Sequence, residues 1–296
     1  MKIVFIGCVK FSEMALKQVL QCSEAEVIGV ITKKFSSYNA DFSSLEGIAK
    51  EKNIPCLLID KQPEVQMEDW IKDKNPDVVY CFGWSNLLPQ EVLNIPRLGV
   101  IGYHPTPLPK NRGRHPIIWT IALGLTSTAS TFFFMDEGAD SGDIISQEFL
   151  SVEDSDDAGK LYSKLSNIAA IQILQFTREL SQSSYKRLPQ DDSKANYWRK
   201  RTKQDGEIDW RMSARSIHNL VKALARPYVG AHCLYQGQEI KIWKTEIVLE
   251  QDDFSHLEPG KVLKVETSSL YVKCGEGIIR ILDHEFTNLP EEGCYF

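Results

Sequence analysis

One histidine and one acidic turn carry the residue types that acid–base chemistry needs. His104 follows an apolar run and precedes a proline-rich stretch at 105–109. The acidic turn contains four carboxylates, which are Asp136, Glu137, Asp140 and Asp143. A histidine exchanges protons near neutral pH, and a carboxylate beside it fixes its tautomer. His104 and Asp140 are therefore a candidate proton-transfer pair. The alternative is a surface histidine and a solvated acidic turn.

The elements that must position this pair follow from hydrophobic periodicity. Short apolar runs predict strands at residues 2–6, 27–32, 54–59, 77–82, 98–103 and 130–135. Helical patterns lie at residues 12–19, 45–52, 68–74, 116–125 and 158–180. This alternation predicts an α/β fold with a mostly parallel, Rossmann-like sheet and helices on both faces. Ligands of such sheets bind beyond the carboxyl ends of the strands, so we expect the loops of His104 and Asp140 to converge there.

The loop after the first strand lacks the full Gly-x-Gly-x-x-Gly pattern, so a dinucleotide site of the usual kind is not supported. Ser12 has two interpretations. It is either the N-cap of the first helix or a substrate contact.

A second, smaller domain is expected after a polar, turn-rich stretch at 181–194. We predict a catalytic domain at 1–192 and a C-terminal domain at 193–296. The latter begins with an amphipathic helix at 213–225 and continues with strands at 232–235, 239–243, 260–265, 270–273 and 277–282. Five short strands in so few residues predict a small β-barrel-like domain of the OB type.

Composition narrows the classes of function. The net charge of -6 disfavours a strongly basic nucleic-acid binder. No apolar stretch approaches the ~18 residues of a membrane span. Seven cysteines without Cys-x-x-Cys spacing favour reduced thiols in a cytoplasmic protein and argue against a zinc cluster.

Three motifs in order resemble the folate-dependent formyltransferases, the family that includes methionyl-tRNA formyltransferases and sugar-nucleotide N-formyltransferases. They are Phe-Gly-Trp-Ser-Asn-Leu-Leu-Pro at 82–89, His-Pro-Thr-Pro-Leu-Pro at 104–109 and Asp-Glu-Gly-Ala-Asp-Ser-Gly-Asp at 136–143. The stretch 201–243 resembles the small C-terminal domain of that family, so the resemblance covers nearly the whole chain.

The resemblance implies transfer of a formyl group from 10-formyltetrahydrofolate to an amine, without a metal. His104 and Asp140 match the catalytic pair of the family. The family pterin site maps onto six residues, which are Ser85, Leu87, Leu88, Asp136, Gly138 and Ala139. Core packing is the alternative for Leu87 and Leu88. Gly102 departs from the pattern, because the family usually has Asn two residues before the histidine. Either an oxyanion donor is missing, or a water or backbone N–H replaces it.

The acceptor amine is expected on an amino-sugar nucleotide, a 4-amino-4,6-dideoxy sugar on dTDP or UDP. Such a product fits pseudaminic acid or surface polysaccharide synthesis. Methionyl-tRNA formyltransferases usually carry a basic insertion after the second strand, whereas residues 32–41 here contain two lysines. The stretch 197–206 resembles the sugar-nucleotide enzymes. Four cations are candidate substrate contacts, namely Lys10, Lys110, Arg112 and Arg114, with surface salt bridges as the alternative.

Three other functions stay open: methionyl-tRNA formylation, folate or nucleotide-sugar binding without turnover, and formate release with water as the acceptor. The expected partner is a small molecule. Neither nucleic acid nor a membrane is expected, and a homodimer is left open.

Overall fold

The computed structural model describes residues 1–36, 40–59, 64–249, 254 and 256–296. These residues divide into two compact units. Unit 1 comprises Met1–Pro116, Thr128–Leu150 and Ser163–Trp198, and unit 2 comprises Ile117–Ser127, Ser151–Tyr162 and Arg199–Phe296. The expected boundary after residue 192 therefore falls inside unit 1. Two segments that we expected in the first domain, 117–127 and 151–162, belong to unit 2.

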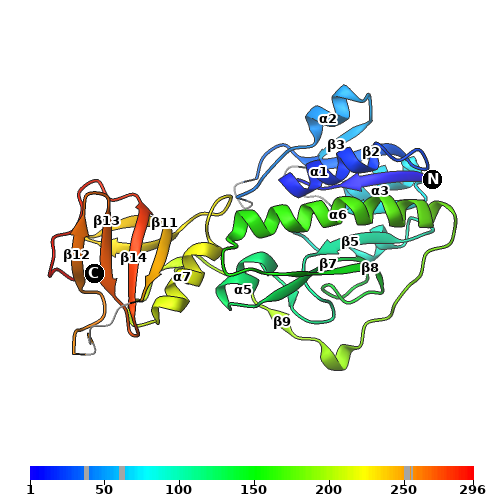
Figure 1. Cartoon of the computed structure of the whole chain (residues 1–296). Helices are drawn as coiled ribbons and strands as arrows, with labels where there is room; N and C mark the ends of the chain where they lie inside the picture. Colours follow the sequence, from blue (N-terminus) through cyan, green and yellow to red (C-terminus); the bar gives the residue numbers. More distant parts are fainter. Residues whose placement is uncertain (37–39, 60–63, 250–253, 255) are drawn as a thin grey trace. The chain divides into compact units, whose positions relative to one another are not determined.

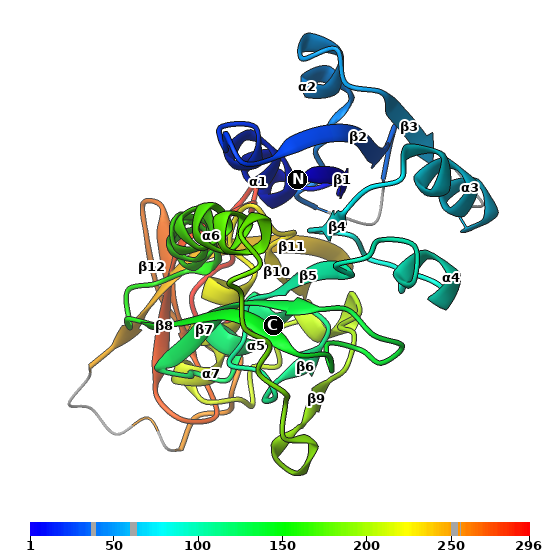
Figure 2. The ribbon, with the colours of Figure 1, turned by 90° about the vertical axis from the view of Figure 1, so that its right-hand side faces the viewer.

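Unit 1 is built on a seven-stranded sheet in the order β3-β2-β1-β4-β5-β7-β8 (Figure 2). Its strands are β1 (Lys2–Ile6), β2 (Glu26–Lys33), β3 (Cys56–Ile59), β4 (Val78–Cys81), β5 (Val100–His104), β7 (Ser127–Phe134) and β8 (Ile144–Ser151). The first five pair in parallel, whereas β7 runs antiparallel to β5. The prediction of a mostly parallel sheet is confirmed, and β8 is a strand that the sequence pattern did not predict.

Helices cover both faces of this sheet (Figure 1). They are α1 (Lys10–Val19), α2 (Glu46–Glu51), α3 (Glu64–Lys74), α4 (Gln90–Leu93) and α6 (Ala158–Ser181). On one face, Tyr80 of β4 packs on Phe176 of α6 with ring centroids 5.6 Å apart. On the other face, Ile71 of α3 and Val92 of α4 share a buried apolar cluster with strand residues. Side chains alternate along a strand, so each strand contributes to both layers.

A two-stranded parallel ladder completes unit 1. It joins β6 (Arg112–Gly113) to β9 (Tyr197–Trp198), which follows the short 3₁₀ helix η1 (Asp192–Lys194) (Figure 2). Because the two strands are far apart in sequence, the ladder fixes the segment 190–198 against the loop after His104.

Unit 2 contains a five-stranded antiparallel sheet in the order β10-β11-β14-β13-β12. The strands are β10 (Ala231–Tyr235), β11 (Gln238–Val248), β12 (Val262–Glu266), β13 (Ser269–Lys273) and β14 (Ile278–His284). The helices are α5 (Pro116–Ala122), the 3₁₀ helix η2 (Gln204–Gly206) and α7 (Ala214–Ala223). All five expected strands are found. Among the described residues, no pairing joins the two edge strands of this sheet, β10 and β12.

The amphipathic pattern of α7 explains its packing. Ile217, Leu220 and Val221 are buried, and the helix packs against β11 and β14. Within the described ranges, no helix has both the length and the apolar character needed to cross a membrane.

Candidate active site

His104 is the last residue of β5, and its imidazole is almost completely buried, with 5% of the residue exposed. Nε2 lies 2.8 Å from the carbonyl oxygen of Asn111. A carbonyl oxygen can only accept a hydrogen bond, so Nε2 carries the hydrogen of this contact. In the neutral ring, Nδ1 is then the nitrogen with a free lone pair. Nδ1 is therefore the atom at which His104 can take up and release a proton.

The carboxylate of Asp140 lies beside that atom. Its Oδ2 is 3.6 Å from Nδ1 of His104 and accepts a hydrogen bond of 2.8 Å from the backbone N–H of Gly113. Asp140 has a φ of +58°, a left-handed conformation that the surrounding contacts must hold. Gln190 supplies two of these contacts, because its Nε2 donates to the carbonyl oxygens of Asp140 (2.9 Å) and Gly142 (2.7 Å). The structure thus brings the two residues of the expected pair together.

The way in which they meet differs from the expectation. We expected two loops to converge at the carboxyl edge of parallel strands. Instead β7 is antiparallel to β5, with His104 paired to Thr131 and Gly102 paired to Phe133. The chain therefore leaves β7 toward the amino end of β5. The segment 135–143 then has to double back, which explains its glycines. A Cβ on Gly142 would lie 1.8 Å from the carbonyl oxygen of Phe134.

Apolar side chains surround the α-carbon of Gly102. A Cβ added to this residue would lie 2.9 Å from Cγ of Met135 and 3.0 Å from Cζ of Phe133. Phe133 also packs with Leu108 and Ile144 in a small buried cluster. The space next to Gly102 is thus filled by hydrocarbon atoms of Met135 and Phe133.

The residues expected around the pterin fall into two classes. Leu88 is 7% exposed and packs in the core cluster of α3 and α4, so its packing alternative holds. Leu87 is 64% exposed beside it. The loop of Asp136, Gly138 and Ala139 is accessible and is shaped by Asp136, whose Oδ1 accepts from the backbone N–H of Gly138 (3.0 Å) and from Ser141 Oγ (2.6 Å). Ser85 is half-buried in the loop after β4.

The expected cationic contacts also separate. Lys10, Lys110 and Arg114 are exposed. The side chain of Arg112 is 2% exposed, and its guanidinium hydrogen-bonds to groups inside the protein, so it is not available to a phosphate. It donates to Gln190 Oε1 (2.8 Å), Asp192 Oδ1 (2.7 Å) and Tyr197 Oη (3.0 Å). We therefore assign Arg112 to the structure of the β6–β9 ladder.

Ser12 is neither an N-cap nor a solvent-facing group. The N-cap of α1 is Val9, and Ser12 lies three residues into the helix with no exposed surface. Its Oγ donates to the carbonyl oxygen of Phe82 (2.5 Å) and accepts from the backbone N–H of Val9 (3.2 Å). Ser12 therefore ties the loop after β1 to the loop after β4.

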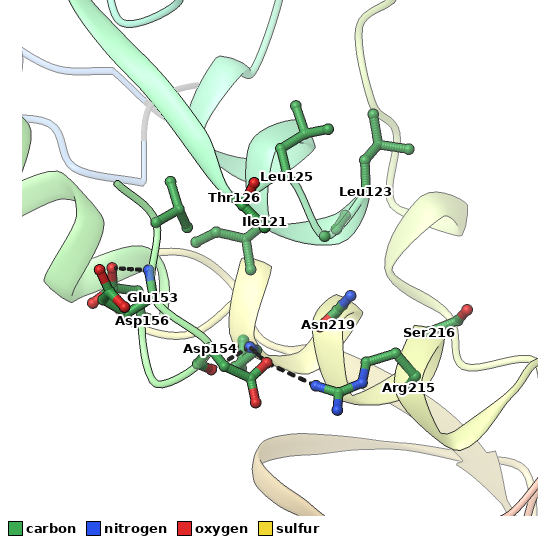
Figure 3. Close-up of a pocket in the computed structure, with 14 residues that line it drawn as sticks. Ile121, Leu123, Leu125, Thr126, Glu153, Asp154, Asp156, Arg215, Ser216 and Asn219 are labelled. Atoms are coloured by element: carbon green, nitrogen blue, oxygen red, sulfur yellow. Dashed lines mark hydrogen bonds and ion pairs between the residues drawn. The ribbon is translucent and has the colours of Figure 1, made fainter. Parts of the chain in front are cut away.

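Unit 2 has a cavity of about 470 Å³ between the end of α5, residues 152–156 and α7 (Figure 3). Arg215 of α7 pairs there with Asp154 at 2.7 Å, and Lys222 donates to the carbonyl oxygen of Asp154. No expected site residue lines this cavity. Across the described part of the chain, no cluster of three His, Cys, Asp or Glu side chains could hold a metal ion.

Comparison with known proteins shows the family to which the chain belongs. A family model described as formyl transferase matches residues 1–177, and one described as formyl transferase, C-terminal domain, matches residues 200–290. The chain is 34% identical over 290 residues to the methionyl-tRNA formyltransferase of Caldanaerobacter subterraneus subsp. tengcongensis, which covers 96% of this chain and 91% of that protein.

Two solved structures share the fold. WlaRD, a sugar 3N-formyl transferase solved with dTDP and 5-N-formyl-THF, has a TM-score of 0.71 at 18% identity and covers 98% of this chain and 99% of its own. The N-formyltransferase of Helicobacter canadensis, solved with folinic acid and dTDP-3-aminofucose, has a TM-score of 0.72 at 16% identity, with coverage of 96% and 99%. On the family models and the sequence identity, the chain belongs to the folate-dependent formyltransferase family, a family of enzymes.

Proposed function

We propose that this enzyme transfers a formyl group from 10-formyltetrahydrofolate to the amine of an amino-sugar nucleotide. A 4-amino-4,6-dideoxy sugar on dTDP or UDP is the acceptor that we favour. The acceptor amine attacks the formyl carbon and forms a carbon–nitrogen bond with it. The bond between the formyl carbon and N10 of the folate then breaks, and the leaving N10 takes up one proton. The amine loses a proton during transfer, so the site needs one group that takes up this proton.

His104 is suited to that task. Its Nε2–H is engaged by the carbonyl oxygen of Asn111, which leaves Nδ1 to accept the proton. The Oδ2 atom of Asp140, 3.6 Å away, offsets the positive charge that the ring then carries. The ring is buried and so keeps one orientation, which general base catalysis requires.

Three features of the first unit fit the folate. The exposed Leu87 offers apolar surface to a pterin, and the accessible loop 136–139 offers backbone groups. Ser85 stands in the same loop as Leu87. We propose that these residues hold the pterin, whereas Leu88 supports the loop from the core.

Our choice of acceptor rests on one observation, which is that cationic side chains of the basic stretch 197–206 pair with other groups of the protein. Its arginines face carboxylates and an indole of their own unit. Arg199 pairs with Asp205, whose pKa is lowered by this hydrogen bond, and the guanidinium of Arg201 lies 4.6 Å above the ring of Trp119. Lys203 pairs with Glu239. Binding of a tRNA depends on many contacts between cationic side chains and its phosphates. Side chains that already pair with carboxylates or an aromatic ring of the protein are poorly suited to make these contacts.

A second candidate is formylation of methionyl-tRNA. It is favoured by the identity of 34% to a methionyl-tRNA formyltransferase over nearly the full length of both chains. Against it stand the net charge of -6 and the two lysines in residues 32–41.

One experiment separates the two acceptors. The purified protein is incubated with 10-formyltetrahydrofolate and either a panel of amino-sugar nucleotides or initiator methionyl-tRNA, and formylated products are detected by mass spectrometry. We expect a formyl adduct on an amino-sugar nucleotide. Comparable formylation of methionyl-tRNA at physiological salt would replace our choice with the second candidate.

A further inference from the structure

The segment 190–198 contacts residues 111–112, next to the buried His104, in two ways. The backbone N–H of Arg112 donates to the backbone carbonyl oxygen of Asn196 (3.0 Å), and the side chain of Asn196 forms an amide pair with Asn111. The backbone N–H of Asn111 donates to Oδ1 of Asn196 (2.9 Å), and Nδ2 of Asn196 donates back to Oδ1 of Asn111 (3.0 Å). Asn196 itself is exposed. Its side chain therefore lies outside the core and holds the backbone N–H and the side chain of Asn111.

The residue that it places is the one that fixes the histidine. Asn111 has a φ of +63°, so its peptide plane adopts an orientation that a relaxed chain would seldom choose. The carbonyl oxygen of Asn111 accepts from Nε2 of His104. This carbonyl shares its peptide plane with the Arg112 N–H, which the backbone of Asn196 also holds, so the side chain of Asn196 reinforces an orientation that the ladder supports. If the carbonyl rotated away, that contact would no longer keep the hydrogen on Nε2, and Nδ1 would no longer be reserved for proton transfer.

A parallel route reaches the carboxylate. Gln190 uses its Oε1 to accept from the buried guanidinium of Arg112 and its Nε2 to donate to the carbonyl oxygens of Asp140 and Gly142. The adjacent backbone N–H of Gly113 donates to Asp140 Oδ2. Gly113 lies in the ladder with β9, and a Cβ there would stand 2.3 Å from the carbonyl oxygen of Trp198. The same segment thus holds both members of the pair.

We propose that Asn196 and Gln190 are positioning residues: Asn196 selects the Nε2–H tautomer of His104 through Asn111, and Gln190 holds Asp140 opposite Nδ1. The kinetic part of this inference rests on the proposed function, whereas the tautomer part does not. Neither residue touches the reacting atoms, so both act on the rate of the chemical step rather than on substrate affinity.

Three variants test the proposal. Asn196→Ala removes both contacts to Asn111. Asn196→Asp retains them, because the Asn111 amide can turn over and donate its Nδ2 to the new carboxylate. Gln190→Glu keeps an acceptor for Arg112 but cannot donate to the carbonyl oxygens of Asp140 and Gly142. The exposed Asn167 of α6 supplies the matched control, Asn167→Ala.

We expect kcat to fall between about 10- and 100-fold in Asn196→Ala and Gln190→Glu, the range that a misplaced catalytic group produces. KM for both substrates should stay within about twofold, and Asn196→Asp and Asn167→Ala should stay close to wild type. Equal losses in Asn196→Ala and Asn196→Asp, or a loss confined to KM, would overturn the positioning role of Asn196. An unchanged kcat in Gln190→Glu would overturn that of Gln190.

A second measurement needs no substrate. Ring ¹⁵N chemical shifts distinguish the two neutral tautomers, and the His104 signals are assigned by comparison with His104→Ala. We expect the Nε2–H form in the wild type and in Asn196→Asp, and a mixture of tautomers in Asn196→Ala. An unchanged tautomer in Asn196→Ala would refute the mechanism. If the enzyme formylates no amine, the proposed function fails, and the ring signals still decide the assignment of Asn196.

Discussion

Nδ1 of His104 lies 3.6 Å from Oδ2 of Asp140, although the strands that lead to these residues run in opposite directions. The contact therefore depends on the backward course of the segment 135–143 and on its hydrogen bonds to Gln190 and Gly113. A separation of 3.6 Å is too long for a direct hydrogen bond, but it allows a strong charge interaction once the ring is protonated.

Replacement of either residue should abolish activity and leave the fold intact. We expect His104→Ala and Asp140→Asn to lower kcat by at least about 100-fold, since each removes a group that acts in the transition state. The Asn side chain retains an oxygen that can accept from Gly113, so the loop should keep its shape. Turnover numbers, with circular dichroism as the check on folding, measure the effect. Activity within a few-fold of wild type would remove that residue from the mechanism.

Gly102→Asn should lower turnover rather than restore a missing donor. The new side chain would collide with Met135 and Phe133, which stand 2.9 and 3.0 Å from the position of a Cβ. Overpacking of this kind costs about 1–3 kcal/mol of stability. Steady-state turnover and the thermal midpoint of the variant test both parts. A tenfold gain in turnover would mean that the native site lacks one oxyanion donor.

The companion double variant Gly102→Asn/Met135→Ala separates steric from chemical effects. Removal of the Met135 side chain makes room for the amide, so turnover should recover relative to Gly102→Asn alone. Met135→Ala by itself is the control. If the double variant is no better than the single one, the collision with Met135 does not explain the loss.

Local patterns predicted most of the sheet but not the edge strand β8. The first five strands of unit 1 are buried apolar runs, so periodicity found them within a few residues. β8 contains Ser146, Gln147 and Glu148 and is half exposed along the sheet edge, so it lacked that signal. The strands β6 and β9 are two residues long and exist only because they pair with each other across the chain.

The candidate site divides in the same way. His104 and Asp140 were found from residue type and from a family motif. Asn111, Asn196 and Gln190 carry no local pattern, because their role depends on contacts between distant segments. The sequence predicts Arg112 as a candidate phosphate contact, because it does not show that the guanidinium is buried and hydrogen-bonded to Gln190, Asp192 and Tyr197.

Arg112→Lys should destabilise unit 1 even though it conserves the charge. A lysine ammonium cannot reproduce the planar set of contacts to Gln190, Asp192 and Tyr197. We expect a loss of about 2 kcal/mol, the scale of unsatisfied buried groups. Denaturant unfolding measures it, with the exposed Arg114→Lys as the matched control. Equal stability of the two variants would contradict the structural role, and a selective rise in KM for the sugar nucleotide in Arg112→Lys would return the residue to phosphate binding.

His218 should make the free energy of unfolding depend on pH, in a pH range above the one in which the carboxylates titrate. Burial, together with Lys222 and Arg215, lowers the pKa of His218 from 6.5 to about 4, against the opposing effects of Asp154 and Glu246. The unfolded chain therefore binds a proton at higher pH than the folded chain. Stability is unaffected by this group above its unfolded pKa and is lost as pH falls from 6.5 toward 4.

The loss between pH 6.5 and about 5 should reach about 1 kcal/mol, allowing for the solvent contact of a half-exposed ring. The salt-bridged Glu239 and Glu266 have pKa values lowered from 4.5 to about 2, so their contributions to stability disappear only at more acid pH.

His218→Asn keeps a donor or acceptor for Thr245, whose Oγ1 lies 3.0 Å from Nδ1 of His218, but removes the titration. Thermal midpoints across this window should therefore fall less steeply for His218→Asn than for wild type. His256→Asn, at an exposed position, should follow the wild-type curve. Parallel curves for all three proteins would show that His218 does not control acid stability in this range, and that His232, whose pKa burial also lowers, is the next histidine to replace.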